Sequence, residues 1–214
     1  MSDVFALFSI LGAILIGAVS PGPSFVVVSR IAITRSRLDG LAAALGVGLG
    51  GALFAALAVG GLTALLLQVG WLHMLLRILG GGYLVYVGVR VFAGAAASID
   101  ADPSAGAGNR SRIRSFRDAL LTHVSNPKTA VVYASIFAAL LPSSPSAWLL
   151  LALPPALFVV EGLWYAVVAL AFSAERPKAA YLRAKPVIDR IAGLVIGALG
   201  VRLLLDALSP DDAG

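Results

Sequence analysis

The chain has 214 residues, of which 59% are hydrophobic and only 13% are charged, and its mean hydropathy is +0.95. Soluble domains carry about 25% charged residues, so this composition excludes an ordinary soluble domain and indicates an integral membrane protein. The net charge is +5, and the absence of cysteine excludes disulfides, thiolate metal sites and a cysteine nucleophile.

Six apolar runs are long enough for membrane-spanning helices, which need about 20 residues each. The first run has no basic segment before it, so we expect no cleaved signal peptide. The second run is rich in glycine and alanine, which lets helices approach closely. Pro154-Pro155 is expected to kink the helix of the fifth run. The expected spans are residues 4–33, 41–67, 72–92, 119–141, 147–172 and 187–208.

The first span is interrupted by the segment Ser20-Pro21-Gly22-Pro23-Ser24. Proline removes a backbone donor and clashes with the carbonyl four residues earlier, and lipid offers the freed group no water. The order Ser20 then Pro21 is that of an N-cap and a first helical residue. We therefore expect the helix to break here and a second half-helix to begin.

A matching interruption lies in the fourth span, at Asn126-Pro127-Lys128. Asn126 is a good N-cap and Pro127 suits the first position of a helix. Each break would bury the positive end of a half-helix, and Lys128 adds a full charge, so the two breaks favour an anionic ligand group such as a carboxylate. Packing kinks, which are ordinary in membrane helices, are the alternative interpretation.

Basic residues are confined to three of the five connections. They are Arg35 and Arg37, then Arg110, Arg112, Arg114 and Arg117, then Arg176, Lys178, Arg183 and Lys185. By the positive-inside rule these connections are cytoplasmic and both termini external. This topology explains the positive charge better than a nucleic-acid partner does, because the arginines form no patch with aromatic residues.

Residues 93–116 read as a flexible cytoplasmic linker because they offer almost nothing to bury. The linker divides one transporter domain, residues 1–214, into three-helix repeats at residues 1–92 and 117–208. An odd number of spans in each half gives the halves opposite orientations, as in the inverted repeats of secondary transporters. The expected fold is all-α, with six transmembrane helices of which the first and fourth are broken.

The sequence resembles the LysE/RhtB family of amino-acid exporters over nearly its whole length. The resemblance is carried by Ser20-Pro21-Gly22-Pro23, by residues 37–40 with Gly46 and Gly50, by residues 80–88, and by residues 116–128, which end in Asn-Pro-Lys. Two positions depart from the family pattern, Asp118 in place of glycine and His123 in place of asparagine. The resemblance implies export of amino acids or close derivatives, driven by the proton-motive force.

Charges inside the membrane usually mark a pathway. Lys128 and Glu161 lie at matching depths of about 15 and 17 Å from the cytoplasmic ends of their spans, at 1.5 Å per residue. They can form a substrate or proton site that opens during transport, or a permanent structural pair. His123 is a candidate proton relay, or a neutral histidine near the interface.

The sequence thus predicts a bacterial inner-membrane exporter that is not an enzyme and needs no cofactor or metal. Its expected partners are an amino acid, protons and the bilayer; a homodimer is compatible with the small-residue face of the second span. Alternatives are export of a metal ion or other small cation and, with less support, a membrane-embedded enzyme. The expected substrate-binding residues are Ser20, Pro21, Gly22, Pro23, Ser24, Asn126, Pro127, Lys128 and Glu161, with Glu161 and His123 as proton-coupling residues.

Overall fold

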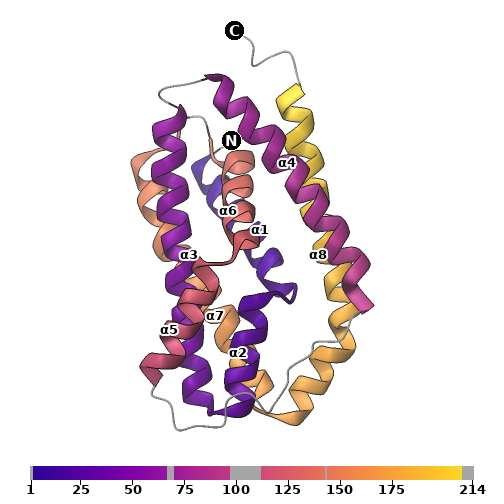
Figure 1. Ribbon diagram of the computed structural model, residues 1–214. Helices are drawn as coiled ribbons and strands as arrows, with labels where there is room; N and C mark the ends of the chain where they lie inside the picture. The colour runs from indigo at the N-terminus through magenta and orange to yellow at the C-terminus, as the bar shows by residue number, and fades with distance from the viewer. Residues whose placement is uncertain (1, 67–69, 97–111, 143, 209–214) are drawn as a thin grey trace.

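The computed structural model describes residues 2–66, 70–96, 112–142 and 144–208, within which all regular structure is helical. Side chains of residues 62–66, 70–77, 96, 127 and 175–178 also lie outside the description. Figure 1 shows the helices as an elongated bundle. They are α1 (Asp3–Val19), α2 (Pro23–Thr34), α3 (Arg37–Leu66), α4 (Gly70–Ala93), the short 3₁₀ helix η1 (Gly94–Ala96), α5 (Arg112–Val124), α6 (Pro127–Leu140), α7 (Ala147–Phe172) and α8 (Glu175–Leu208).

Three described segments are long and apolar enough to cross a bilayer: Arg37–Gly61, Ala147–Phe172 and Ala179–Leu208. Helices α1 and α2 qualify as one further span, bent by 60° at the break expected in the first span. Ile78–Ala93 and Lys128–Leu140 are shorter apolar helices. By length and composition the described residues therefore give three spans, or four with the bent pair, rather than the six expected.

Two helices extend beyond their apolar segments. Helix α8 begins at Glu175, so Lys185 lies inside a helix and not in a connection as expected. Lys185 is buried because it pairs with Asp189, one turn later, at 2.9 Å. Helix α5 begins at Arg112, within the expected linker, whose residues 97–111 lie outside the described residues.

The outer surface carries large apolar side chains, as a bilayer environment requires. Phe8, Leu151 and Leu194 are 67%, 77% and 63% exposed, and each lies on a different helix. Together with the apolar spans, this surface identifies the chain as a membrane protein.

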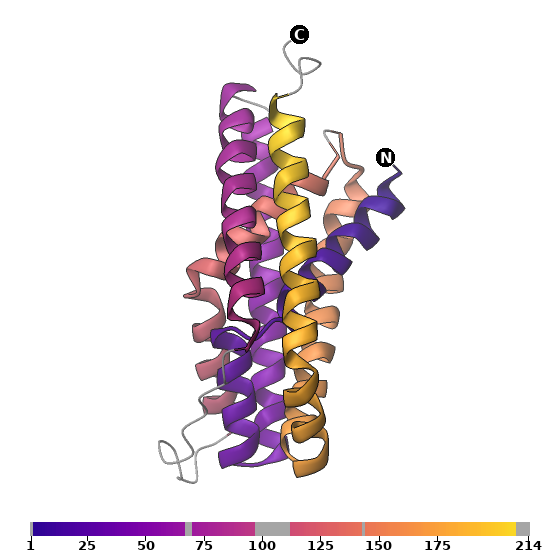
Figure 2. The same ribbon diagram turned by 90° about the vertical axis from the view of Figure 1, so that its right-hand side faces the viewer.

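Glycine allows the helices to pack closely, as expected for the second span. A Cβ at Gly46 would collide with the Phe116 backbone of α5, and a Cβ at Gly48 would lie 2.8 Å from the Phe158 carbonyl of α7. A similar approach joins α4 to α8, where a Cβ at Gly88 would lie 2.6 Å from the Gly193 carbonyl. Figure 2 shows α4 and α8 side by side along most of their length, with α1 inclined to them.

The buried apolar side chains form two separate clusters along the bundle. On α7 the first cluster includes Leu149, Leu153 and Leu157, and the second begins at Tyr165. On α3 the two clusters lie on either side of residues 50–51. A polar layer that contains Glu161 therefore separates them, close to the middle of α7.

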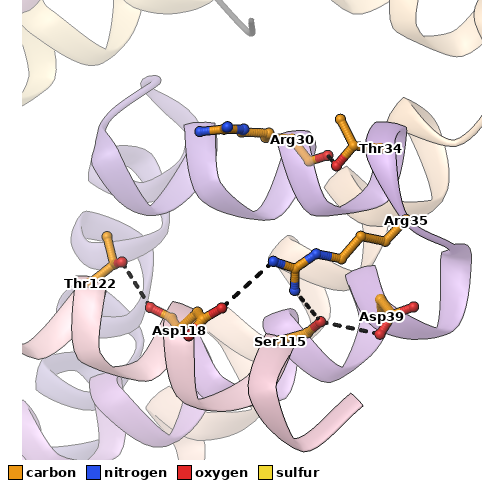
Figure 3. A network of polar contacts seen from close by, with 7 residues as sticks. All are labelled: Arg30, Thr34, Arg35, Asp39, Ser115, Asp118 and Thr122. Atoms are coloured by element: carbon orange, nitrogen blue, oxygen red, sulfur yellow. Dashed lines mark hydrogen bonds and ion pairs between the residues drawn. The ribbon is translucent and has the colours of Figure 1, made fainter. Parts of the chain in front are cut away.

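A network of polar contacts joins α2, α3 and α5 at the lower end of the bundle in Figure 1, as Figure 3 shows from close by. The Arg35 guanidinium donates to Ser115 Oγ at 2.8 Å and pairs with Asp118 at 3.7 Å. Ser115 Oγ in turn donates to Asp39 Oδ1 at 3.1 Å. Asp118, one of the two departures from the family pattern, is therefore compensated by Arg35.

Candidate functional site

The two helix breaks meet at one cavity in the polar layer between the apolar clusters. The cavity has an internal volume of about 50 Å³. Its lining comes from α1, α2, α5, α6, α7 and α8 and from both breaks, and includes Ser20, Gly22, Ser24, His123, Asn126, Lys128, Thr129, Tyr133, Glu161, Tyr165 and Ile196. Chain segments about a hundred residues apart therefore form one site.

The first break differs in detail from the expectation. Ser20 ends α1 in an extended conformation, and the N-cap of α2 is Gly22, with Pro23 in the first turn. The predicted cap at Ser20 was wrong because Pro21 and Gly22 both remain outside the helix. No side chain caps α2, so backbone N–H groups of its first turn lack helical partners.

Two side chains from other helices satisfy the last carbonyls of α1. Trp164 Nε1 donates to the Ala18 carbonyl at 3.1 Å, and Tyr181 Oη donates to the Val19 carbonyl at 3.2 Å. Carbonyls at a helix end have no intrahelical donor. These two bonds therefore supply the missing donors and stabilise the end of α1 at the break.

The second break has the expected construction. The Asn126 side chain accepts a hydrogen bond from the Lys128 backbone N–H at 3.0 Å, and Pro127 follows at the first position of α6. The N-cap interaction fixes the start of α6 at the cavity wall and leaves the Lys128 side chain in the cavity.

The Lys128 ammonium group lies beside the first break, since its Nζ is 3.8 Å from the position of a Cβ on Gly22. No ion pair joins it to Glu161 or to any other described residue. Asp189, already paired with Lys185, exerts an attraction on it from farther away. Because the ammonium group lies beside the N-terminus of α2 and follows that of α6, the positive potential here favours an anion.

Glu161 pairs with His123. The pair of Glu161 with Lys128, which their matching depths allowed, does not form. His123 Nε2 and Glu161 Oε2 are 3.3 Å apart, and His123 Nδ1 is 2.9 Å from Ser24 Oγ in a hydrogen bond. Ser24, His123 and Glu161 are 3%, 2% and 2% exposed. His123 is thus fully inside the protein and connects α2 to α7, which corrects its interpretation as an interfacial residue.

This row of a hydroxyl, an imidazole and a carboxylate has the components of a hydrolase triad, a constellation that sequence spacing did not indicate. The three residues come from α2, α5 and α7. The same residues serve equally well as a path for a proton between two ends of a cavity.

Most of the expected site residues come together. Ser20, Gly22 and Ser24 line the cavity with Asn126, Lys128, His123 and Glu161, whereas Pro21 and Pro23 shape the break without lining it. The side chain of Pro127 lies outside the described residues.

The cavity also has lining residues that are not among the predicted site residues. Tyr133 and Tyr165 line it, and Ile196 contributes from α8. Tyr133 lies five residues after Lys128 on α6, so helical spacing alone would not have placed the two on one face.

These features define a class of protein: a helical membrane protein whose broken helices meet at a cavity with several polar and charged side chains, the arrangement used by carriers of small solutes. Residues 15–207 match the family model described as LysE type translocator, so the chain belongs to the LysE type translocator family. This confirms the resemblance seen in the sequence.

Relatives over most of the chain have names that agree with this family. The threonine efflux protein of Salmonella typhimurium is 31% identical over 203 residues, covering 92% of this chain and 97% of the relative. The threonine efflux protein of Escherichia coli is 31% identical over 196 residues, 89% and 93% of the two chains. The leucine efflux protein of Salmonella choleraesuis matches 134 residues at 31% identity, 60% and 59% of the two chains. No solved structure matches the chain significantly.

Proposed function

We propose that this protein exports amino acids or close derivatives across the bacterial cytoplasmic membrane, driven by the proton-motive force. One structural observation carries the proposal: the Lys128 ammonium group and the starts of two half-helices meet in one buried cavity. A cation at membrane depth that is only partly exposed and has no ion-pair partner among the described residues is costly unless a ligand neutralises it. A substrate carboxylate is such a ligand, and the printed names of the relatives favour an amino acid.

In this proposal the carboxylate binds between Lys128 and the backbone N–H groups of the two breaks, residues 20–24 and 126–128. Glu161 faces the substrate ammonium group or carries the coupling proton. The contacts of His123 with Glu161 and Ser24 support a proton path from the cavity wall to the start of α2.

The cavity volume indicates how the transport cycle must proceed. An internal volume of about 50 Å³ has room for about four water molecules, at 10–15 Å³ each. That is less than a whole amino acid needs, so the helices around the cavity must separate to admit substrate.

The helix pairing supports the inverted repeat. If α1–α4 correspond in order to α5–α8, the contacts of α3 with α7 and of α4 with α8 map onto themselves, and the contact of α1 with α6 maps onto that of α2 with α5. The contacts of α4 with α6 and of α1 with α8 have no comparable counterpart, so the correspondence is partial. The proposed halves are residues 1–92 and 117–208, joined by a cytoplasmic linker at 93–116, with six spans in total and both termini external.

The test is counterflow in proteoliposomes that contain the purified protein, with a panel of labelled amino acids and the reconstituted E. coli threonine efflux protein as positive control. We expect accumulation of at least one amino acid, and faster net export under an imposed proton gradient. Absence of counterflow for every amino acid, beside an active control, would refute the proposal. Flux of metal cations alone would favour a cation exporter.

A further inference from the structure

Three buried polar atoms lie together beside the cavity: His123 Nε2, Tyr133 Oη and Glu161 Oε2. They have no hydrogen bond of good geometry to other described residues, although Glu161 lies within reach of both His123 and the Tyr133 hydroxyl. Each of the three residues is 2% exposed. His123 Nε2 and Glu161 Oε2 face each other at 3.3 Å without hydrogen-bond geometry. Buried polar groups normally have partners, because leaving one unpaired costs about 1–3 kcal/mol, so such a concentration needs an explanation.

Gly51 of α3 leaves space at this place. A Cβ there would collide with Glu161 Oε2 and would lie 2.8 Å from Tyr133 Oη. The missing Cβ therefore makes room for both oxygen atoms, which lie close together against the α3 backbone. Tyr133 is held in this direction by Phe54, 5.5 Å away between ring centroids, and by the stacked ring of Phe137 at 6.2 Å.

All three atoms can act as hydrogen-bond acceptors at once. A carboxylate only accepts, and a phenol oxygen can accept. In the neutral imidazole tautomer that donates from Nδ1 to Ser24 Oγ, Nε2 also accepts. The ligand group that matches three convergent acceptors beside a carboxylate is a primary ammonium, which has three donors and a positive charge.

We propose that Tyr133, together with Glu161 and His123, forms the subsite for a primary ammonium group, and that the Tyr133 hydroxyl makes the exporter selective for substrates that carry one. This inference rests on the proposed function, in which Lys128 binds the carboxylate on another side of the same cavity. The two subsites together recognise a zwitterion, the form of a free α-amino acid at neutral pH. N-acylated and 2-hydroxy derivatives have no primary ammonium group, so they can occupy only the carboxylate subsite at Lys128.

The informative variant is Tyr133→Phe, which keeps the ring and removes only the hydroxyl. The hydroxyl lies beside the Glu161 carboxylate, to which it can donate a hydrogen bond, so its removal is expected to lower thermal stability only slightly. The control is Tyr83→Phe, on α4 and outside this cavity. Both are assayed by counterflow of the amino acid that the wild-type protein exchanges best, and by its competition with the 2-hydroxy analogue.

We expect Tyr133→Phe to lower the apparent affinity for the amino acid about tenfold, the effect of one hydrogen bond to a charged group, and to leave inhibition by the 2-hydroxy analogue within twofold of wild type. Tyr83→Phe should change neither. Unchanged affinity for the amino acid, or equal losses of affinity for both ligands, would each overturn the inference, since equal losses mean that the hydroxyl has only a structural role. If wild-type protein exchanges no amino acid at all, the proposed function itself fails.

Discussion

Gly51 shows how one residue lets α3 pack against side chains of the site. The α3 backbone passes so close to Glu161 and Tyr133 that no side chain fits between them. The requirement is one of space, since no described residue has a positive φ. The neighbouring Gly50 packs equally closely against His123: a Cβ on Gly50 would lie 2.7 Å from His123 Cδ2. Gly50 and Gly51 of α3 thus pack directly against three side chains that line the cavity.

We predict that Gly51→Ala lowers stability and transport together. The added methyl group overpacks the polar layer, which costs about 1–3 kcal/mol and lowers the melting temperature in detergent by about 2–10 °C. Gly60→Ala on the same helix is the control, because nothing lies within 4 Å of its Cβ position. Equal melting temperatures for the two variants would contradict the described packing.

Residues of the site were predictable from sequence where the signal is local. Asn126 and Lys128 follow from capping chemistry and from the cost of charge in lipid. The contacts of His123 were not predictable, because Ser24 is 99 residues away and Glu161 lies on a third helix. Matching depths made Lys128 a suitable partner for Glu161, yet depth does not specify which helix face a side chain occupies.

At the scale of elements, α2, α3 and α5 depend on the polar network at their common end (Figure 3). Ser115 is fully buried and bridges the Arg35 guanidinium to Asp39. The Ser115 hydroxyl on α5 therefore lies between the Arg35 guanidinium at the end of α2 and the Asp39 carboxylate on α3. Sequence reading treated Arg35 only as a topology signal and Asp118 only as a departure, because the network exists only once the three helices have packed.

We predict that Ser115→Ala destabilises the protein by about 1–3 kcal/mol, since both charged groups lose a buried partner. Thr122→Ala is the matched control, because its hydroxyl donates only to the Asp118 carbonyl within the same helix. Thermal unfolding of the purified variants measures the difference. A Ser115→Ala melting temperature no lower than that of Thr122→Ala would show that the network contributes nothing.

The spans expected from hydropathy agree with the observed bounds of some helices and differ from those of others. Helix α7 matches its expected span because the apolar run and the helix coincide. Both prolines of the expected kink lie inside this helix, which continues through them. Helices α5 and α8 begin earlier than expected because their first turns are polar, and hydropathy does not detect a helix that stabilises its charges through side-chain pairs such as Lys185 with Asp189.

At the scale of the whole molecule, basic residues gather at one end. In Figure 1 the α2–α3 and α7–α8 connections and the start of α5 all lie at the lower end. Arg35, Arg37, Arg112 and Arg114 lie there, whereas Arg110 and the side chains of Arg176 and Lys178 lie outside the description. The proposed orientation has this end in the cytoplasm.

Single-cysteine variants test this orientation, because the native chain has no cysteine. Ile113 at the start of α5 is 78% exposed, and Ser144 between α6 and α7 is also exposed. In intact cells a membrane-impermeant maleimide should label Ser144→Cys and should label Ile113→Cys only after permeabilisation. The opposite labelling pattern would contradict the proposed orientation of the chain in the membrane.

The central claim, that Lys128 neutralises a substrate carboxylate, is tested most directly by counterflow of Lys128→Met in proteoliposomes. Methionine keeps the length and apolar volume of lysine and removes the charge, and Lys128→Arg serves as the control that keeps it. We predict a folded, inserted Lys128→Met protein whose amino-acid exchange falls at least about tenfold, the loss of one charged hydrogen bond or more, while Lys128→Arg retains measurable exchange. Exchange by Lys128→Met at the wild-type rate would contradict the account.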